Sequence, residues 1–107
     1  MPHIDEVRQK KRFTYINRDA PSTATDITTK TTYVTKIRIL NRTAGALTIS
    51  IDDKSSTPVE KYTAISIAAN QLSLEVMATM PETFTDGVTI NASATGLSVT
   101  IEGFQEP

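Results

Sequence analysis

Apolar and polar residues alternate one by one along most of the chain after residue 30. Ile37 and Ile39, for example, are separated by Arg38. Such alternation is typical of β-strands, because successive side chains of a strand point to opposite faces. Short clusters of Gly, Asn, Asp and Pro interrupt the pattern where turns are expected. The pattern predicts six strands, at residues 32–40, 47–52, 62–67, 72–76, 88–91 and 97–102.

The two faces of each predicted strand differ in polarity. In the first strand, alternation places Tyr33 with Ile37 and Ile39 on an apolar face, and leaves Lys36 and Arg38 on a polar one. An apolar sheet face must be covered, and a second sheet is the usual cover in an all-β protein. We therefore predict an all-β fold, a two-sheet antiparallel sandwich of jelly-roll or Ig-like type.

The first thirty residues do not follow this pattern. Residues 12–16 indicate one short strand, but residues 17–30 are mostly polar and cannot form a core of their own. We expect an extended N-terminal arm at residues 1–30, which becomes ordered when it lies on a partner or on the domain. The β-sandwich domain then comprises residues 31–107.

The composition agrees with a β-rich domain and offers little for catalysis. Thr accounts for 18 and Ser for 8 of the 107 residues, and the β-branched Thr suits the half-exposed surface of a sheet. The chain has no Cys and a single histidine, His3, near the N-terminus, where chains are commonly least ordered. We therefore assign no catalytic residue and no cofactor site, and we expect no enzymatic activity.

Two groups of acidic residues are the remaining candidates for metal binding or catalysis. Asp52 and Asp53 could bind a hard cation, although adjacent acids in a polar loop more often interact with solvent, and the alternatives stay open. Glu82 and Asp86 lie in the longest predicted loop, residues 77–86, without a second feature that indicates acid–base chemistry. No metal site is assigned.

The formal net charge of -1 hides an uneven distribution. Residues 1–42 hold nine Lys and Arg against four acids, a net charge of +5, and residues 43–107 hold two against eight, a net charge of -6. The basic part could dock on an acidic partner or on another copy, or be solvated surface without a partner. The acidic total disfavours nucleic-acid binding. No apolar run is long enough to span a membrane and the first residues lack the apolar core of a signal peptide, so we expect synthesis in the cytoplasm and no membrane partner.

Several basic residues near the N-terminus are interleaved with two aromatic ones. Such a cluster can bind nucleic acid through phosphate contacts and stacking. On an acidic domain we favour contact with a protein, because aromatic residues and Arg dominate protein interfaces. The expected partner-binding residues are Arg8, Lys10, Lys11, Arg12, Phe13 and Tyr15. A second candidate contact patch, Met77, Met80 and Phe84, could equally close one end of the sandwich core.

Five segments follow one another in a recognisable order: TTYVTKIRILNRT at 31–43, LTISI at 47–51, ISIAANQL at 65–72, DGVTINAS at 86–93 and VTIEGF at 99–104. A strand that ends in an Asn-Thr type turn leads to a Thr-rich strand, an Asp-Gly pair precedes an Ile-rich strand, and the last strand ends in Gly. Together these segments resemble a family of small β-sandwich structural proteins of tailed bacteriophages.

The resemblance implies a virion structural protein. The main hypothesis is a capsid decoration or cement protein that binds the major capsid protein through its sandwich and its arm. The alternative is a tail, neck or fibre component of the same particle. The resemblance also implies a homo-oligomer, such as a trimer, located in the virion. A glycan-binding module is less favoured, since it would need exposed aromatic residues, and Tyr33 and Tyr62 are expected on the apolar side of their strands.

Overall fold

The computed structural model describes residues 11–54, 59–76 and 81–106. All regular structure in these residues is β-strand, and none of them forms a helix that is long and apolar enough to cross a membrane. The strands are β1 (Lys11–Asn17), β2 (Thr25–Asp26), β3 (Thr32–Asn41), β4 (Leu47–Asp53), β5 (Val59–Ile67), β6 (Leu72–Val76), β7 (Glu82–Phe84), β8 (Val88–Ala92) and β9 (Leu97–Gln105).

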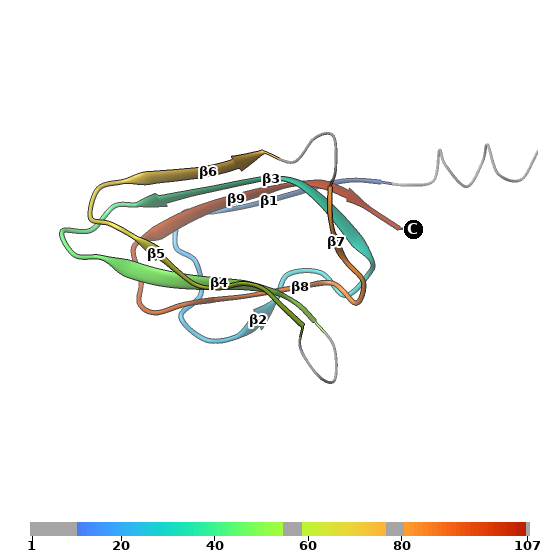
Figure 1. Cartoon of the computed structure of the whole chain (residues 1–107), viewed down its shortest axis with the longest axis horizontal. Helices are drawn as coiled ribbons and strands as arrows, with labels where there is room; N and C mark the ends of the chain where they lie inside the picture. Colours follow the sequence, from blue (N-terminus) through green and yellow to red (C-terminus); the bar gives the residue numbers. More distant parts are fainter. Residues whose placement is uncertain (1–10, 55–58, 77–80, 107) are drawn as a thin grey trace, which may run out of the picture.

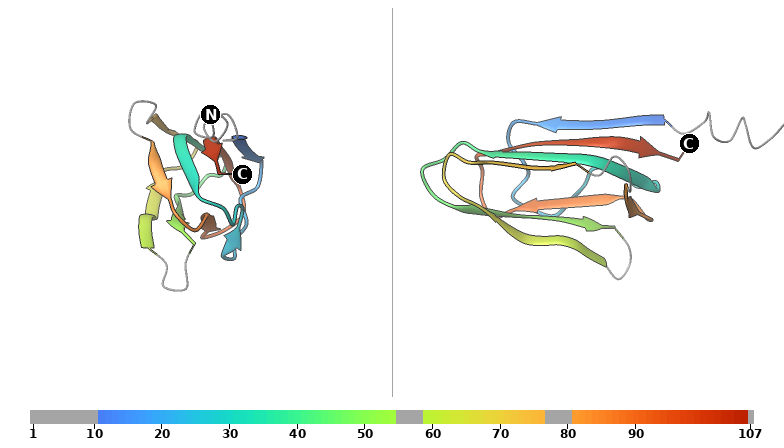
Figure 2. Two further views of the ribbon diagram at one scale, coloured as in Figure 1. Left: turned by 90° about the vertical axis from the view of Figure 1, so that its right-hand side faces the viewer. Right: turned by 45° about the horizontal axis from the view of Figure 1, so that its top comes forward.

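The strands form two antiparallel sheets that lie face to face (Figure 1). The first sheet has the order β1-β9-β3-β6, and the short β7 also pairs with β3. The second sheet has the order β2-β8-β4-β5. Figure 2 shows the two layers from the end and obliquely. The prediction of an all-β, two-sheet antiparallel sandwich is confirmed.

The pairing of the strands is nested along the chain. β4 pairs with β5, β3 with β6, β2 with β8 and β1 with β9, so each successive pair encloses the one before it in sequence. Two further pairings, β3 with β9 and β4 with β8, join these pairs into the two sheets. The chain therefore runs as one long antiparallel hairpin that is folded over into two layers.

The core between the sheets is built from every second residue of the strands. In β9, for example, Leu97, Val99 and Ile101 are buried, whereas Ser98 and Thr100 are half-buried on the other face. This is the alternation from which the strands were predicted, and it removes apolar surface from water on both inner faces. Among the side chains that the structure describes, the buried apolar ones are Phe13, Ala20, Val34, Ile37, Ile39, Ile49, Ile51, Ile67, Phe84, Val88, Ile90, Ala92, Leu97, Val99 and Ile101.

The six predicted strands are present as β3, β4, β5, β6, β8 and β9, and the short strand predicted at residues 12–16 is present as β1. Two strands were not predicted. β7 lies inside the segment expected as the longest loop, and β2 lies inside the expected arm. Each of them has only two or three residues, too few for an alternating pattern to be recognised.

Residues 11–30, the described part of the expected arm, lie within the sandwich. β1 forms one edge of the first sheet, and β2 forms one edge of the second. Between these strands the N–H of Ala20, a buried residue, donates a hydrogen bond of 2.8 Å to the carbonyl oxygen of Leu97. In the described part of the chain the sandwich therefore begins at β1 rather than at residue 31. Residues 1–10 lie outside the described part.

A β-bulge in β3 changes the face on which Tyr33 lies. The register of β3 with β9 shifts between Val34 and Lys36, and the pairing skips Thr35. One extra residue inverts the alternation of side chains beyond it. Val34 and Ile37 are therefore both buried, and Tyr33 lies half-buried on the outer face. The prediction that Tyr33 shares the apolar face with Ile37 is wrong for this reason.

Candidate interaction surface

The described members of the predicted partner-binding cluster are divided between exposed and buried positions of β1. Lys11 and Arg12 are exposed, whereas Phe13 is only 9% exposed and belongs to the core. Tyr15 is half-buried and packs against the same core. The members that lie outside the described residues are Arg8 and Lys10. The two aromatic side chains thus help to hold β1 on the sandwich, and the described cations are the members that a partner can reach.

The register of β1 with β9 explains this division. Phe13 lies opposite Gly103, which in turn lies opposite Val34 at the bulge of β3. A Cβ atom on Gly103 would collide with the carbonyl oxygen of Tyr33, so the backbones of β9 and β3 approach closely here. Only glycine permits such an approach. Arg12 alternates with Phe13 and therefore lies on the outer face.

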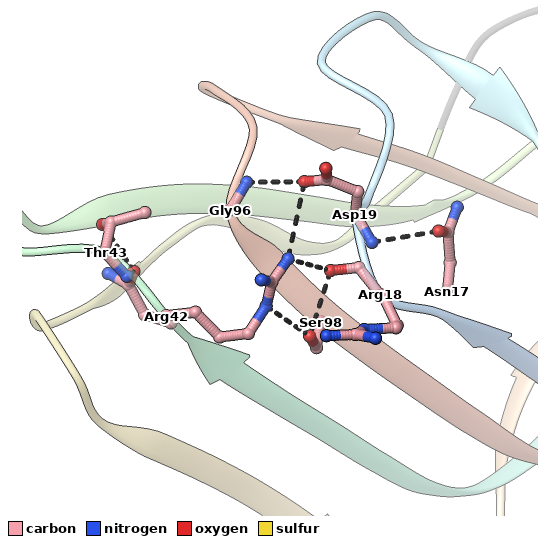
Figure 3. Close-up of polar contacts among 8 residues, drawn as sticks. Asn17, Arg18, Asp19, Arg42, Thr43, Gly96 and Ser98 are labelled. Carbon is pink, nitrogen blue, oxygen red and sulfur yellow. Dashed lines mark hydrogen bonds and ion pairs between the residues drawn. The ribbon is translucent and has the colours of Figure 1, made fainter.

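Arg42, the residue after β3, fastens the segment that follows β1 (Figure 3). Its Nη2 donates a hydrogen bond of 2.6 Å to the carbonyl oxygen of Arg18, and its Nε donates one of 2.9 Å to Ser98 Oγ. Ser98 Oγ donates to the same carbonyl oxygen at 3.0 Å. Asp19 lies 3.8 Å from Arg42 Nη2 and accepts a hydrogen bond of 2.7 Å from the N–H of Gly96. This group, the Arg42 clamp, ties the end of β1 to the turn between β8 and β9.

Sequence reasoning did not find the Arg42 clamp. Arg42 is 24 residues from Arg18 and 56 residues from Ser98 in the sequence. No local pattern connects residues that are so far apart. Arg42 lies in the turn after a predicted strand, a position that gives no sign of a structural role. The clamp could be found only once the strand order was known.

Tyr33 holds the segment after β9 against the outer side of the first sheet. Its Oη donates a hydrogen bond of 2.7 Å to Glu106 Oε1. This hydrogen bond, followed by burial of the ring and by the negative charge of Glu106, raises the pKa of Tyr33 above its ordinary value of 10.0. The N–H of Glu106 also donates to the carbonyl oxygen of Thr31 at 2.9 Å.

Asp52 and Asp53 lie on opposite faces of β4. Asp53 is only 5% exposed, and its carboxylate accepts hydrogen bonds from the N–H groups of Thr85 at 2.8 Å and Asp86 at 2.9 Å. Asp52 is half-buried on the outward side, opposite Thr89. The two carboxylates therefore do not converge on one point, and Asp53 instead fixes the turn between β7 and β8. Among the described residues, no three His, Cys, Asp or Glu side chains are grouped so as to hold a metal ion.

Phe84 is the described member of the second predicted patch. It ends β7, is fully buried and belongs to the core. The alternative that Phe84 closes the sandwich core is thereby confirmed. The other two members, Met77 and Met80, lie outside the described residues.

The comparisons with known proteins add one structural likeness. No protein-family model matches the chain, and no curated protein matches its sequence. Among solved structures, the fold is similar to the coat protein of Tobacco streak virus, solved as a dimer, with a TM-score of 0.43 and 10% sequence identity. The likeness covers 92% of this chain and 87% of that one.

Proposed function

We propose that this chain is a bacteriophage virion structural protein, a capsid decoration or cement protein that binds and stabilises the shell of the major capsid protein. The nested strand order carries this proposal, because a long hairpin folded into sheets of order β1-β9-β3-β6 and β2-β8-β4-β5 is the arrangement of a jelly roll. Jelly rolls are common in viral capsid domains and in lectins. The resemblance of residues 31–104 to phage β-sandwich proteins supports the choice of a phage particle.

The proposed role is adhesive and requires no enzymatic chemistry. The exposed cations Lys11 and Arg12, together with Arg8 and Lys10 before them in sequence, would contact acidic side chains of the capsid. A single exposed ion pair contributes only about 0–1 kcal/mol. A homotrimer that engages three neighbouring sites at once would multiply such contacts, because each further contact forms at a high effective concentration.

Binding to particles tests the proposal. Particles of the phage that encodes this chain are assembled without it, mixed with the purified full-length chain and sedimented. A decoration protein would saturate at a fixed ratio to the major capsid protein and would raise the temperature at which the particles rupture. Saturation at a few copies per particle would assign the chain to the tail, neck or fibres. A chain that does not sediment with the particles would contradict a virion role.

Charge reversal tests the predicted cluster without damaging the fold. Removal of residues 11–17 would take Phe13 out of the core, so we prefer the double variant Lys11→Glu, Arg12→Glu, in which both side chains are exposed. This variant is expected to bind particles more weakly and to melt at an unchanged temperature. Lys30→Glu alters an exposed Lys outside the cluster and is the matched control. Equal binding of the double variant and the control would contradict the role of the cluster.

A further inference from the structure

The outer faces of the two sheets differ in chemistry. On the second sheet, the described outward side chains are all polar: Asp26, Thr48, Ser50, Asp52, Ser66, Thr89 and Asn91. On the first sheet, the outer face carries three exposed large apolar side chains, Ile16 at 71%, Leu72 at 51% and Phe104 at 44% exposure. Outside residues 55–64 and 73–80, no other large apolar side chain of residues 11–106 is exposed to this degree. Single exposed apolar side chains are common on protein surfaces, but here all three lie on the sheet face that also carries Arg12 of the predicted cluster.

The register of the first sheet places these side chains on one face. Ile16 lies opposite Thr100, which lies opposite Arg38, and Leu72 lies opposite Leu40. Residues directly opposite each other in neighbouring strands share a face of the sheet. The residues that alternate with them in β3 and β9 are buried in the core. Around Ile16 and Leu72, the outer face of the first sheet therefore combines apolar side chains with the exposed guanidinium of Arg38.

The opposite end of the same face is aromatic and cationic. Phe104 lies opposite Tyr33 on one side and opposite Arg12 on the other. Tyr and Arg are among the residue types that most often contribute large shares of the binding energy of protein interfaces. Arg12 also belongs to the predicted partner-binding cluster, so the cluster and this face are continuous.

Positive charge prevails on this face. Lys36 lies 3.4 Å from Glu102, so these two charges offset each other. The carboxylate of Glu106 accepts the hydrogen bond from Tyr33. Within the described residues, no carboxylate forms an ion pair with Arg12 or Arg38. Two guanidinium groups thus remain for a carboxylate of a partner, and such pairs would be charge-assisted hydrogen bonds.

We infer that the outer face of the β1-β9-β3-β6 sheet docks on a protein surface in which carboxylates surround an apolar patch. Charge complementarity favours this occupant over a second copy. Two copies of this face would bring the positive charges of Arg12 and Arg38 near those of the second copy. On the outer face of the second sheet, the described side chains include carboxylates but no large apolar group. The net charge of -1 disfavours nucleic acid as the occupant. The inference rests on the proposed function in taking the capsid as the partner.

The lack of cysteine in the chain permits site-specific labelling. Thr14→Cys places a thiol on the outer face of the first sheet and Ser66→Cys places one on that of the second; both positions are exposed and both lie in edge strands. Each full-length variant is labelled with a maleimide under two conditions, once as the free protein and once after it has bound to particles that were assembled without the chain. We expect particles to suppress labelling at residue 14 and to leave labelling at residue 66 unchanged.

The possible outcomes separate this inference from the proposed function. The chain could bind particles and yet be protected from labelling only at Ser66→Cys, or equally at Ser66→Cys and Thr14→Cys. Either result would contradict the inferred docking face but not the virion role. Failure to bind particles would overturn both. Protection of Thr14→Cys in the free chain as its concentration rises would assign the face to a second copy, and would also overturn the inference.

The charge of the face gives a second measurement. Arg38→Glu is expected to raise the Kd for particles about tenfold or more, which corresponds to about 1.4 kcal/mol. The effect should be larger at low ionic strength, because salt screens exposed charges. Ser66→Glu, which adds a charge to the other outer face, is the matched control and should bind like the unaltered chain. An unchanged Kd for Arg38→Glu would contradict the inference.

Discussion

Arg42 Nη2 and the carbonyl oxygen of Arg18 are joined by a hydrogen bond of 2.6 Å that links the end of β3 to the segment after β1. β1 is an edge strand and pairs only with β9 in the described part of the chain. An edge strand has backbone hydrogen bonds to one neighbour only, so contacts beyond that ladder add to its attachment. The Arg42 clamp supplies such contacts, and it does so at the start of the crossover from the first sheet to the second.

Loss of the clamp should destabilise the fold. Arg42→Ala removes the hydrogen bonds to Arg18 and to Ser98, and we expect the free energy of unfolding to fall by about 1–2 kcal/mol in urea denaturation. The matched control is Arg38→Ala, an exposed Arg in β3, for which we expect a change within about 0.5 kcal/mol. Equal losses in the two variants would show that the clamp contributes nothing to stability.

The buried side chain of Asn41 should be sensitive to the loss of its donor group. Asn41 Nδ2 donates to the carbonyl oxygens of Gly45 and Ile67, both at 2.9 Å. Asn41→Asp would replace this donor by an oxygen that faces two carbonyl oxygens, so we expect a loss of about 2–3 kcal/mol at neutral pH. Asn91→Asp, at an exposed position in β8, is the control and should change stability little. A stable Asn41→Asp variant would contradict the assignment of these hydrogen bonds.

The close approach of β9 to the bulge of β3 should not tolerate a side chain. In Gly103→Ala the added methyl group would meet the carbonyl oxygen of Tyr33, which is backbone and cannot move alone. We expect a loss of about 3 kcal/mol or more in thermal or urea unfolding. Gly45→Ala adds the same methyl group where no atom beyond the two neighbouring residues in the chain lies within 4 Å, and it should change stability by less than about 0.5 kcal/mol. Comparable stability of the two variants would refute the close approach.

The hydrogen bond between Tyr33 and Glu106 should be visible in an alkaline titration. Because the pKa of Tyr33 is raised in the folded state, the bond stabilises the fold fully below the ordinary value of 10.0 and loses this effect as the pH rises through the folded pKa. Glu106→Gln should bring the pKa of Tyr33 down towards the ordinary value. The measurement is the ultraviolet absorbance of tyrosinate, with Tyr33→Phe to identify the signal. A titration that is the same in wild type and Glu106→Gln would exclude this bond.

Much of the fold could be predicted from the alternation of apolar and polar residues, because the face on which a side chain of a strand lies depends on its position in the local sequence. The places of β3, β4, β8 and β9 could therefore be predicted. The bulge at Thr35 could not, since an extra residue in a ladder depends on the partner strand. This one residue moved Tyr33 to the outer face and created the aromatic pair with Phe104. The three-residue strand β7 could not be predicted either, because it forms by pairing with β3, which is distant in the sequence.

The candidate surface was predictable only in part. The cations of the N-terminal cluster were identified, but the burial of Phe13 depends on the pairing of β1 with β9, for which the sequence has no local signal. Phe104 did have such a signal. Continuing the alternation of β9 two residues beyond Glu102 would have placed Phe104 on the outer face. Exposed Ile16 follows in the same way from the alternation of β1.

The central claim is that this chain is part of a bacteriophage virion. Quantitative mass spectrometry of gradient-purified particles of the phage that encodes it tests this claim most directly. The account predicts that the chain is recovered with the particles in a fixed molar ratio to the major capsid protein, and that the ratio survives repeated banding at moderate ionic strength. Particles that are complete and infectious yet contain none of the chain would contradict it.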